Sequence, residues 1–173
     1  GTVRQPVRVV HYLNQFFGGI GGEDKAYEPV QVKDGPVGPG RALQAALGED
    51  ATVVSTIVVG DNYATEELES TLGAAGEHLD RIKPDVVIAG PAFDAGRYGL
   101  ACAEFCRLAT AKGIPAVTGM HPENAGVLTH RKDILAVSTG IDVSEMGQIV
   151  GKMARLAMKV VRGEELGPAS SEG

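Results

Sequence analysis

The chain has 173 residues, and 24 of them are glycine, about twice the number that average usage predicts. Its 22 acidic side chains outnumber its 16 Lys and Arg side chains, and no basic run occurs, so binding to nucleic acid is not expected. No apolar run reaches the roughly 18 residues that cross a membrane, and the first residues lack the pattern of a signal peptide. We therefore expect a cytoplasmic protein that does not contact membranes.

The first half of the chain predicts two strands and two helices. Residues 7–13 are rich in valine and indicate a strand, and a glycine-rich loop follows over residues 14–40. A short Ala- and Leu-rich helix ends at Gly48, and the second strand covers residues 52–59. Apolar residues then recur every three or four positions over residues 68–82, as on one face of a helix.

The second half continues the alternation. Residues 85–89 form an uninterrupted apolar run, which is typical of a parallel strand buried on both faces. A helix over residues 97–112 and two strands, over residues 114–118 and 134–138, come next. A last helix begins near Asp142 or Ser144. We predict one α/β domain over residues 1–163, with residues 164–173 as a tail or the start of a linker.

Strands that alternate with helices in this way imply right-handed βαβ units. The predicted fold is an open, mainly parallel sheet in three layers, with helices on both faces. Its strand order is expected to be flavodoxin-like, 2-1-3-4-5, or Rossmann-like.

Polar, aromatic and glycine residues follow every predicted strand. Ligands of open parallel sheets bind beyond the carboxyl ends of the strands, so these side chains are predicted to share one rim and to bind a small substrate. The candidate substrate-binding residues are Asn14, Gln15, Glu23, Asp24, Asp61, Asn62, Phe93, Asp94, Arg97 and Glu123.

Two kinds of chemistry are open to these candidates. Backbone N–H groups at the helix start near Arg97, together with its guanidinium group, can hold a carboxylate. The same segment also fits a stiff turn in which Asp94 caps the helix and Arg97 is solvated. The acidic candidates suit an amine or a metal ion, and each one alone also fits an ordinary solvated side chain.

The glycine-rich segment 18–22 does not match a known phosphate-binding loop. It lacks the third glycine of a dinucleotide fingerprint, and the chain has no Walker lysine at this point. Two Phe residues and an Asn-Gln pair stand beside the glycines, which favours an ordered loop over a ligand. A linker without chemical function is the alternative.

Histidine and cysteine give further candidates. His11 and His121 follow or end predicted strands and are the candidate catalytic residues, but no third ligand accompanies them, so no metal site is predicted. Cys102 and Cys106 lie one helical turn apart. Free cysteine is commonly buried, and we expect both to pack in the core rather than to carry redox chemistry.

Five segments together resemble one family. They are VVHYLNQFFGGIGGEDKA at residues 9–26, GPVGPG at 35–40, GDNY at 60–63, AGPAFDAGRYG at 89–99 and PAVTGM at 115–120. The chain resembles, from about residue 9 to residue 167, the N-terminal portion of the selenoprotein B subunit of glycine, sarcosine and betaine reductases.

This resemblance implies a substrate-binding component of an enzyme that cleaves a C–N bond reductively. Such an enzyme releases an amine and passes a carboxymethyl group to a partner selenoprotein. The family's redox selenocysteine or cysteine lies in the C-terminal portion, which this chain lacks. No cofactor is therefore expected in this chain, and a second subunit or a missing C-terminal half is expected to supply the nucleophile.

The chemistry of the candidate side chains suggests a role for each in such a reaction. The helix start at residues 94–97 would bind the substrate carboxylate, Glu23, Asp24 and Asp61 would face the amine, and His11 or His121 would protonate the leaving group. Two alternatives stay open at this point. One is a non-catalytic subunit that docks a partner chain through the same rim, and the other is a stand-alone nucleotide-binding domain.

Overall fold

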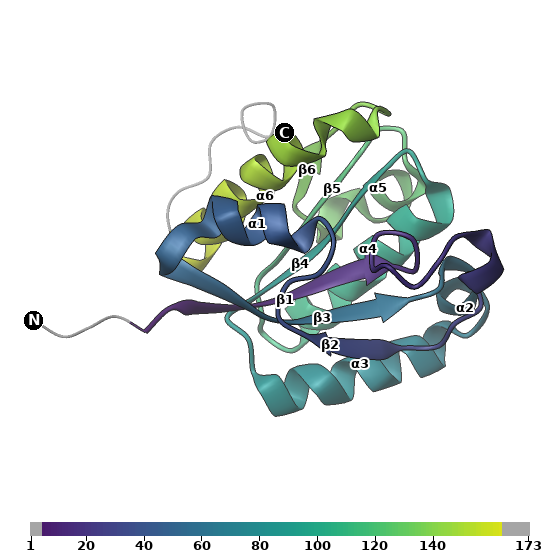
Figure 1. Ribbon diagram of the computed structural model, residues 1–173, viewed down its shortest axis with the longest axis horizontal. Coiled ribbons are helices and arrows are strands. Elements are labelled where there is room, and N and C mark those ends of the chain that lie inside the picture. Colours follow the sequence, from purple (N-terminus) through teal and green to yellow (C-terminus); the bar gives the residue numbers. More distant parts are fainter. Residues whose placement is uncertain (1–4, 164–173) are drawn as a thin grey trace, which may run out of the picture.

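The computed structural model describes residues 5–163. One sheet of six strands lies between two layers of helices (Figure 1). The strands are β1 (Val7–Asn14), β2 (Gln31–Asp34), β3 (Ala51–Val59), β4 (Val86–Phe93), β5 (Ala116–Met120) and β6 (Ala136–Ser138). The helices are α1 (Gly40–Leu47), α2 (Asp61–Glu66), α3 (Leu68–Ile82), α4 (Gly96–Ala111), α5 (Ala125–His130) and α6 (Met146–Val161).

The strand order is β2-β3-β1-β4-β5-β6. The five strands β3, β1, β4, β5 and β6 pair in parallel, and β2 adds an antiparallel edge to β3. Numbered along the chain, the parallel strands have the order 2-1-3-4-5. The predicted open α/β fold with flavodoxin-like order is thus confirmed.

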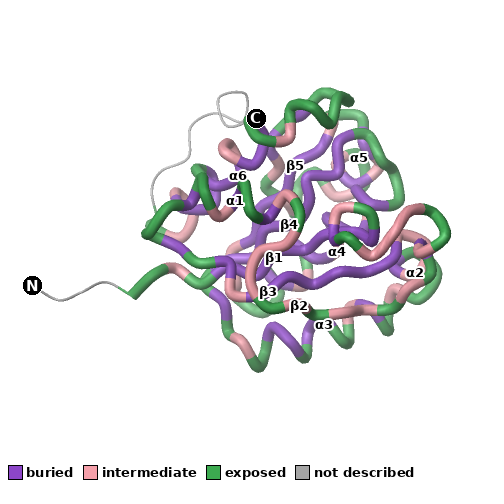
Figure 2. The backbone as a smooth tube through the Cα atoms, in the orientation of Figure 1, coloured by how far each residue is buried: buried purple, intermediate pink, exposed green. Residues whose placement is uncertain are grey.

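Alternating side chains divide the core between the two faces of the sheet. Val10 and Tyr12 of β1 pack with α3 and α4, whereas Val9 packs with α1 and α6. Figure 2 shows the central strands buried and the outward turns of α3 exposed. Within residues 5–163 no helix has both the length and the apolar character needed to cross a bilayer.

Three short elements were not predicted. The loop expected over residues 14–40 contains β2, a four-residue edge strand whose residues alternate between half-buried and exposed. Helices α2 and α5 have six residues each, too few to show a helical period. Strand β4 also runs past its predicted end at Ala89 to Phe93. The tail predicted for residues 164–173 lies outside the described residues.

A glutamine joins α1 to the sheet. The register between β1 and β3 shifts at Val54, which leaves an extra residue in β3. At this point the Gln44 side chain accepts a hydrogen bond from the Val53 backbone at 2.7 Å and donates to the Ala51 carbonyl at 2.9 Å. Gln44 thus supplies partners to backbone groups beside the register shift.

Replacing Gln44 by Met should therefore destabilise the fold. The variant keeps the side-chain volume but leaves a buried N–H and a carbonyl group without a partner, so the free energy of unfolding is expected to fall by about 1–2 kcal/mol. Urea unfolding measures this change. Gln148→Met, at an exposed position on α6, is the matched control, and an equal loss in both variants would contradict the role of Gln44.

Candidate functional site

The loops that follow the parallel strands meet at one end of the sheet, around the start of α2 and of α4 (Figure 1). The chain leaves β1 toward β3 on one side and returns to β4 on the other, so the strand order reverses between β1 and β4. Ligands of open α/β sheets bind at such a reversal. Asn14 ends β1, and Asp61 and Arg97 stand at the starts of the helices that follow β3 and β4.

Asp61 is the centre of one cluster. It is the first residue of α2, and its Oδ2 atom accepts a hydrogen bond of 3.0 Å from Asn14 Nδ2. Its backbone N–H donates to Gln15 Oε1 at 2.9 Å. Asn14 Oδ1 in turn accepts from the Phe17 backbone at 2.9 Å. Residues 14 and 15, at the end of β1, therefore hold both the carboxyl group and the backbone of Asp61.

The environment of Asp61 favours the neutral form of its carboxyl group. Burial raises its pKa to about 6, and the charge of Glu23 adds to the rise, while the hydrogen bond from Asn14 and the charge of Arg97 oppose it. Among residues 5–163 the Oδ1 atom is buried without a hydrogen-bond partner. A half-buried carboxylate with a free oxygen is suited to receive a cation, because the cation would replace lost hydration.

Arg97, just after β4, lies next to this cluster. It lies in the first turn of α4, is exposed, and its guanidinium group donates to Asn62 Oδ1 on α2. An arginine in the first turn of a helix adds its charge to the free backbone N–H groups there. The structure thus places a carboxyl group and a guanidinium group on neighbouring helix starts.

A buried aromatic cluster adjoins Asp61. Tyr12 stacks on Phe105 with ring centroids 3.9 Å apart and meets Tyr98 edge-on at 5.7 Å. Burial raises the pKa of both tyrosines, and the charge of Asp61 contributes to each rise. Within the described part of the chain the Tyr12 hydroxyl group has no hydrogen-bond partner, whereas interaction with the Asn14 backbone opposes the rise in the pKa of Tyr98. The hydrophobic pattern around Tyr12, Tyr98 and Phe105 is that of core residues, so none of the three is a candidate site residue from the sequence alone.

The loop from β4 to α4 is held by the loop that follows β5. Phe93 has a left-handed backbone (φ 52°), and its carbonyl group accepts from the His121 N–H at 2.7 Å and from Asn124 Nδ2 at 3.0 Å. Asn124 was not a candidate, although an asparagine just before a helix is a typical N-cap. Gly90–Pro91, within β4, is a cis peptide bond.

The two candidate catalytic histidines have different surroundings. His11 is fully buried, and its Nε2 lies 2.8 Å from the Gly90 carbonyl oxygen, so Nε2 carries the proton and donates it. Burial lowers the pKa of His11 to about 4, and the ring is neutral at pH 7. His121 is half-buried, and its Nδ1 accepts from the Glu123 backbone at 3.0 Å, which leaves an Nε2–H group free to donate.

The remaining candidates are on the surface. Glu23, Asp24, Asp94 and Glu123 are exposed. Of these, Glu23 lies close enough to Asp61 for its charge to raise the pKa of that residue. Among the described residues, no three His, Cys, Asp or Glu side chains gather as a metal site requires.

Both cysteines are free and buried in α4, as predicted. Burial raises the pKa of Cys106 to about 12 and that of Cys102 well above its usual value. The thiolate form is therefore absent at neutral pH, and neither thiol is suited to act as a nucleophile here.

A buried Ser–His pair elsewhere is structural. Ser55 Oγ lies 2.8 Å from His78 Nε2, and Arg81 donates to His78 Nδ1 at 3.1 Å. Because arginine can only donate, Nδ1 carries no proton and Nε2–H must donate to the serine. In this tautomer His78 cannot accept the proton of Ser55, so it does not activate the Ser55 hydroxyl as a nucleophile.

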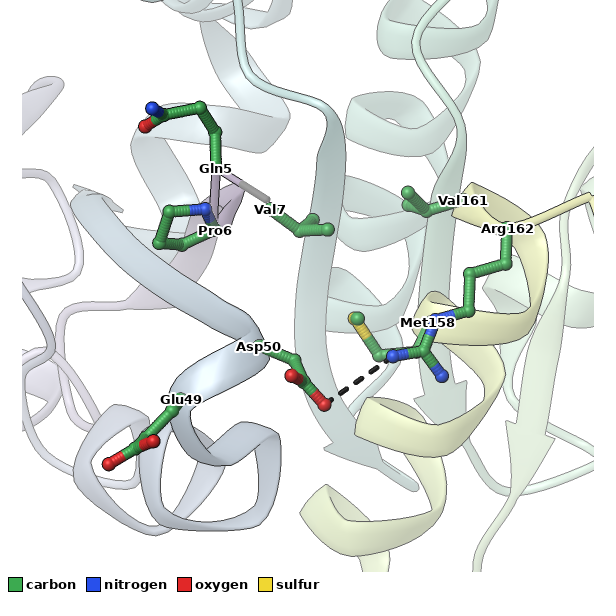
Figure 3. Close-up of a pocket in the computed structure, with 8 residues that line it drawn as sticks. All are labelled: Gln5, Pro6, Val7, Glu49, Asp50, Met158, Val161 and Arg162. Carbon is green, nitrogen blue, oxygen red and sulfur yellow. Dashed lines mark hydrogen bonds and ion pairs between the residues drawn. The ribbon is translucent and has the colours of Figure 1, made fainter. Parts of the chain in front are cut away.

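A hollow of about 330 Å³ lies at the opposite end of the sheet. Figure 3 shows it between the start of β1, the short 3-10 helix Gly48–Asp50 and the end of α6. Arg162 spans part of it to reach Asp50 at 3.4 Å. None of the candidate residues lines this hollow.

The chain is similar to known proteins over nearly its whole length. The family model of glycine/sarcosine/betaine reductase selenoprotein B matches residues 6–173. A sarcosine reductase complex component B subunit beta of Peptoclostridium acidaminophilum is 46% identical over 168 residues, which cover 96% of this chain and 38% of the relative. A glycine reductase complex component B subunit gamma of Carboxydothermus hydrogenoformans is 47% identical over 167 residues, with the same shares covered.

A betaine reductase complex component B subunit beta of Peptoclostridium acidaminophilum is 42% identical over 168 residues, again 96% of this chain and 38% of the relative. This chain thus spans 38% of the length of these relatives. No solved structure matches it. The family match covers nearly the whole chain, and the chain belongs to the glycine/sarcosine/betaine reductase selenoprotein B family.

Proposed function

We propose that this chain is the part of a glycine-, sarcosine- or betaine-reductase component B that binds the small substrate. The relatives are components of complexes named for these three compounds. All three compounds carry a carboxymethyl group on a nitrogen that is positively charged in water. A site for them needs an acceptor for the cation and a donor for the carboxylate.

The unpartnered Oδ1 of Asp61 carries the proposal. This carboxyl group would receive the substrate cation, with Glu23 and Asp24 adding negative charge at the exposed edge. Arg97 and the first N–H groups of α4 would receive the carboxylate. Asn14 and Gln15 orient Asp61, and Asn62 orients Arg97.

In the proposed reaction a thiolate or selenolate, which another chain or a further portion of the protein supplies, attacks the carbon next to nitrogen. The new bond to sulfur or selenium forms as the C–N bond breaks, and the nitrogen keeps the electron pair. The amine leaves as a neutral molecule and then takes up a proton on the electron pair that it kept. Of the two candidate donors, His121 fits this step better, because its Nε2–H group is free, whereas the single N–H of neutral His11 is bound to Gly90.

A docking role for the same rim is the second candidate. Phe16, in the loop after β1, is 63% exposed, and Ile141, in the loop after β6, is 64% exposed. Exposed apolar side chains around a site suit contact with another chain. A docking subunit without substrate contact would tolerate changes at Arg97, whereas a substrate-binding subunit would not.

Replacing Arg97 by Gln in the complete reductase distinguishes these functions. The expected result is an increase in KM for the amino-acid substrate of about 10- to 100-fold, because a carboxylate loses its charged donor. Amine release in the presence of a thiol reductant measures it. Arg107→Gln, on the same helix but paired with Glu104, is the matched control, and unchanged KM in both variants would favour the docking role.

A further inference from the structure

Asn124 joins two loops that are far apart in the sequence. It is 3% exposed and stands in the loop after β5. Its Nδ2 donates to the Phe93 and Ala95 carbonyl groups, each at 3.0 Å, and its Oδ1 accepts from the Gly126 backbone at 2.9 Å. One buried amide therefore caps α5 and binds the segment that leads into α4.

Two glycines make room for this amide. A Cβ atom at Gly99 would overlap the side chain of Asn124, and a Cβ atom at Gly126 would overlap the backbone of Gly99. The contact thus depends on three positions, one in α4 and two around the start of α5. Such close approach of backbone is what glycine allows and other residues do not.

The segment that Asn124 holds has an unfavourable backbone. Phe93 adopts the left-handed region at φ 52°, which is unfavourable for a residue with a side chain. The N-cap of α4, Ala95, makes no side-chain capping hydrogen bond. Its carbonyl group accepts from both Gly99 and Asn124. Without Asn124, this segment keeps the hydrogen bond from the His121 N–H to Phe93 but loses both side-chain hydrogen bonds to the loop after β5.

This segment decides where Arg97 lies. Arg97 follows Ala95 by two residues, in the first turn of α4, and its side chain crosses to Asn62 at the Asp61 cluster. We propose that Asn124 is a positioning residue that holds the start of α4, and with it Arg97, in place to bind a carboxylate. The assignment of a carboxylate to Arg97 rests on the proposed function, whereas the hold on the segment does not.

The test compares Asn124→Ser with Asn14→Ser. Serine at position 124 can still cap α5 but is too short to reach the Phe93 and Ala95 carbonyl groups. Serine at position 14 removes instead the amide that binds Asp61. Acetate, which offers only a carboxylate, and methylammonium, which offers only a cation, are titrated into the 173-residue chain and followed by NMR. Hydrogen exchange is measured at the Ala95 and Gly99 N–H groups, which donate to the Ala92 and Ala95 carbonyl groups.

For Asn124→Ser we expect about tenfold faster exchange at the Ala95 and Gly99 N–H groups and about tenfold weaker acetate binding, with methylammonium binding changed less than about twofold. Asn14→Ser should show the opposite preference between the two probes. A variant that loses both probes equally, or that keeps its exchange rates at Ala95 and Gly99, overturns the proposal.

Failure of the proposed function and failure of the Asn124→Ser variant to fold can each be distinguished from failure of the proposal on Asn124. If the unsubstituted chain binds neither probe, the proposed function fails, and the exchange rates alone still decide whether Asn124 holds the segment. If Asn124→Ser does not fold, Asn124→Asp is used. The Asp side chain keeps the cap on α5 but places a carboxylate against the two carbonyl groups. We again expect weaker acetate binding with methylammonium binding nearly unchanged.

Discussion

Asp61→Asn is expected to weaken binding of the amino-acid substrate by about 100-fold while raising the stability of the chain. Asparagine has the same shape and can still accept from Asn14, so the geometry of the cluster is retained. It cannot neutralise a cation, and the loss of affinity follows from this. Isothermal titration of the complete component with its substrate measures it.

The gain in stability follows from the pKa of Asp61. The pKa rises on folding, from its usual value of 3.8 to about 6, so this group opposes folding increasingly as the pH increases through that interval. At pH 7 the carboxyl group is ionised, and its full unfavourable contribution to the free energy of folding is present. Because solvent still reaches part of the carboxyl group, we expect a gain of about 1 kcal/mol, or about 2–4 °C in Tm.

The pH dependence of binding gives a second readout. Only the ionised carboxyl group attracts a cation, so the Kd of the unsubstituted protein should rise about tenfold per pH unit below pH 6. The Kd of the Asp61→Asn variant should not rise in this way below pH 6. Asp34→Asn, on the edge strand β2, is the control for removing an exposed acidic charge. Equal effects of Asp34→Asn and Asp61→Asn on Kd would refute the role of Asp61.

The burial of His11 is expected to make the fold less stable in acid. Its pKa falls on folding from 6.5 to about 4, so the unfolded chain takes up a proton first as the pH decreases. Stability from this group is complete above pH 6.5 and is lost as the pH falls toward 4. The free energy of unfolding should decrease by about 3 kcal/mol over this interval.

His11→Gln isolates this contribution. Glutamine can still donate to the Gly90 carbonyl group but does not titrate, so the stability of the variant should depend much less on pH between 6.5 and 4. Urea unfolding at several pH values gives the difference between the two profiles. The comparison is needed because Asp61 acts in the opposite direction between pH 3.8 and 6.

His78 offers the matched control. Burial and the charge of Arg81 lower its pKa too, so it also destabilises the fold in acid. His78→Gln should leave the His11 contribution intact. Superimposable profiles for His11→Gln and the unsubstituted chain would show that His11 is not the group that titrates.

Local sequence patterns predict strands and helices, but not the contacts between residues far apart in the chain. The strands that form β1, β3 and β4 were predicted because continuous apolar runs are local patterns, and the handedness of βαβ units then restricts their order. The burial of Cys102 and Cys106 followed from their place on a helix face. Edge strand β2 was missed because a half-buried strand of four residues carries too little pattern to distinguish it from a loop.

The sequence by itself determined the open, mainly parallel sheet and narrowed its strand order, because these depend on local periodicity and chain handedness. Only the tertiary structure decided the chemistry of individual groups. The carboxyl group of Asp61 is held by Asn14 from 47 positions away, and Asn124 reaches Phe93 from 31 positions away. Burial and hydrogen bonds between such distant residues set protonation and position, and no local pattern encodes them.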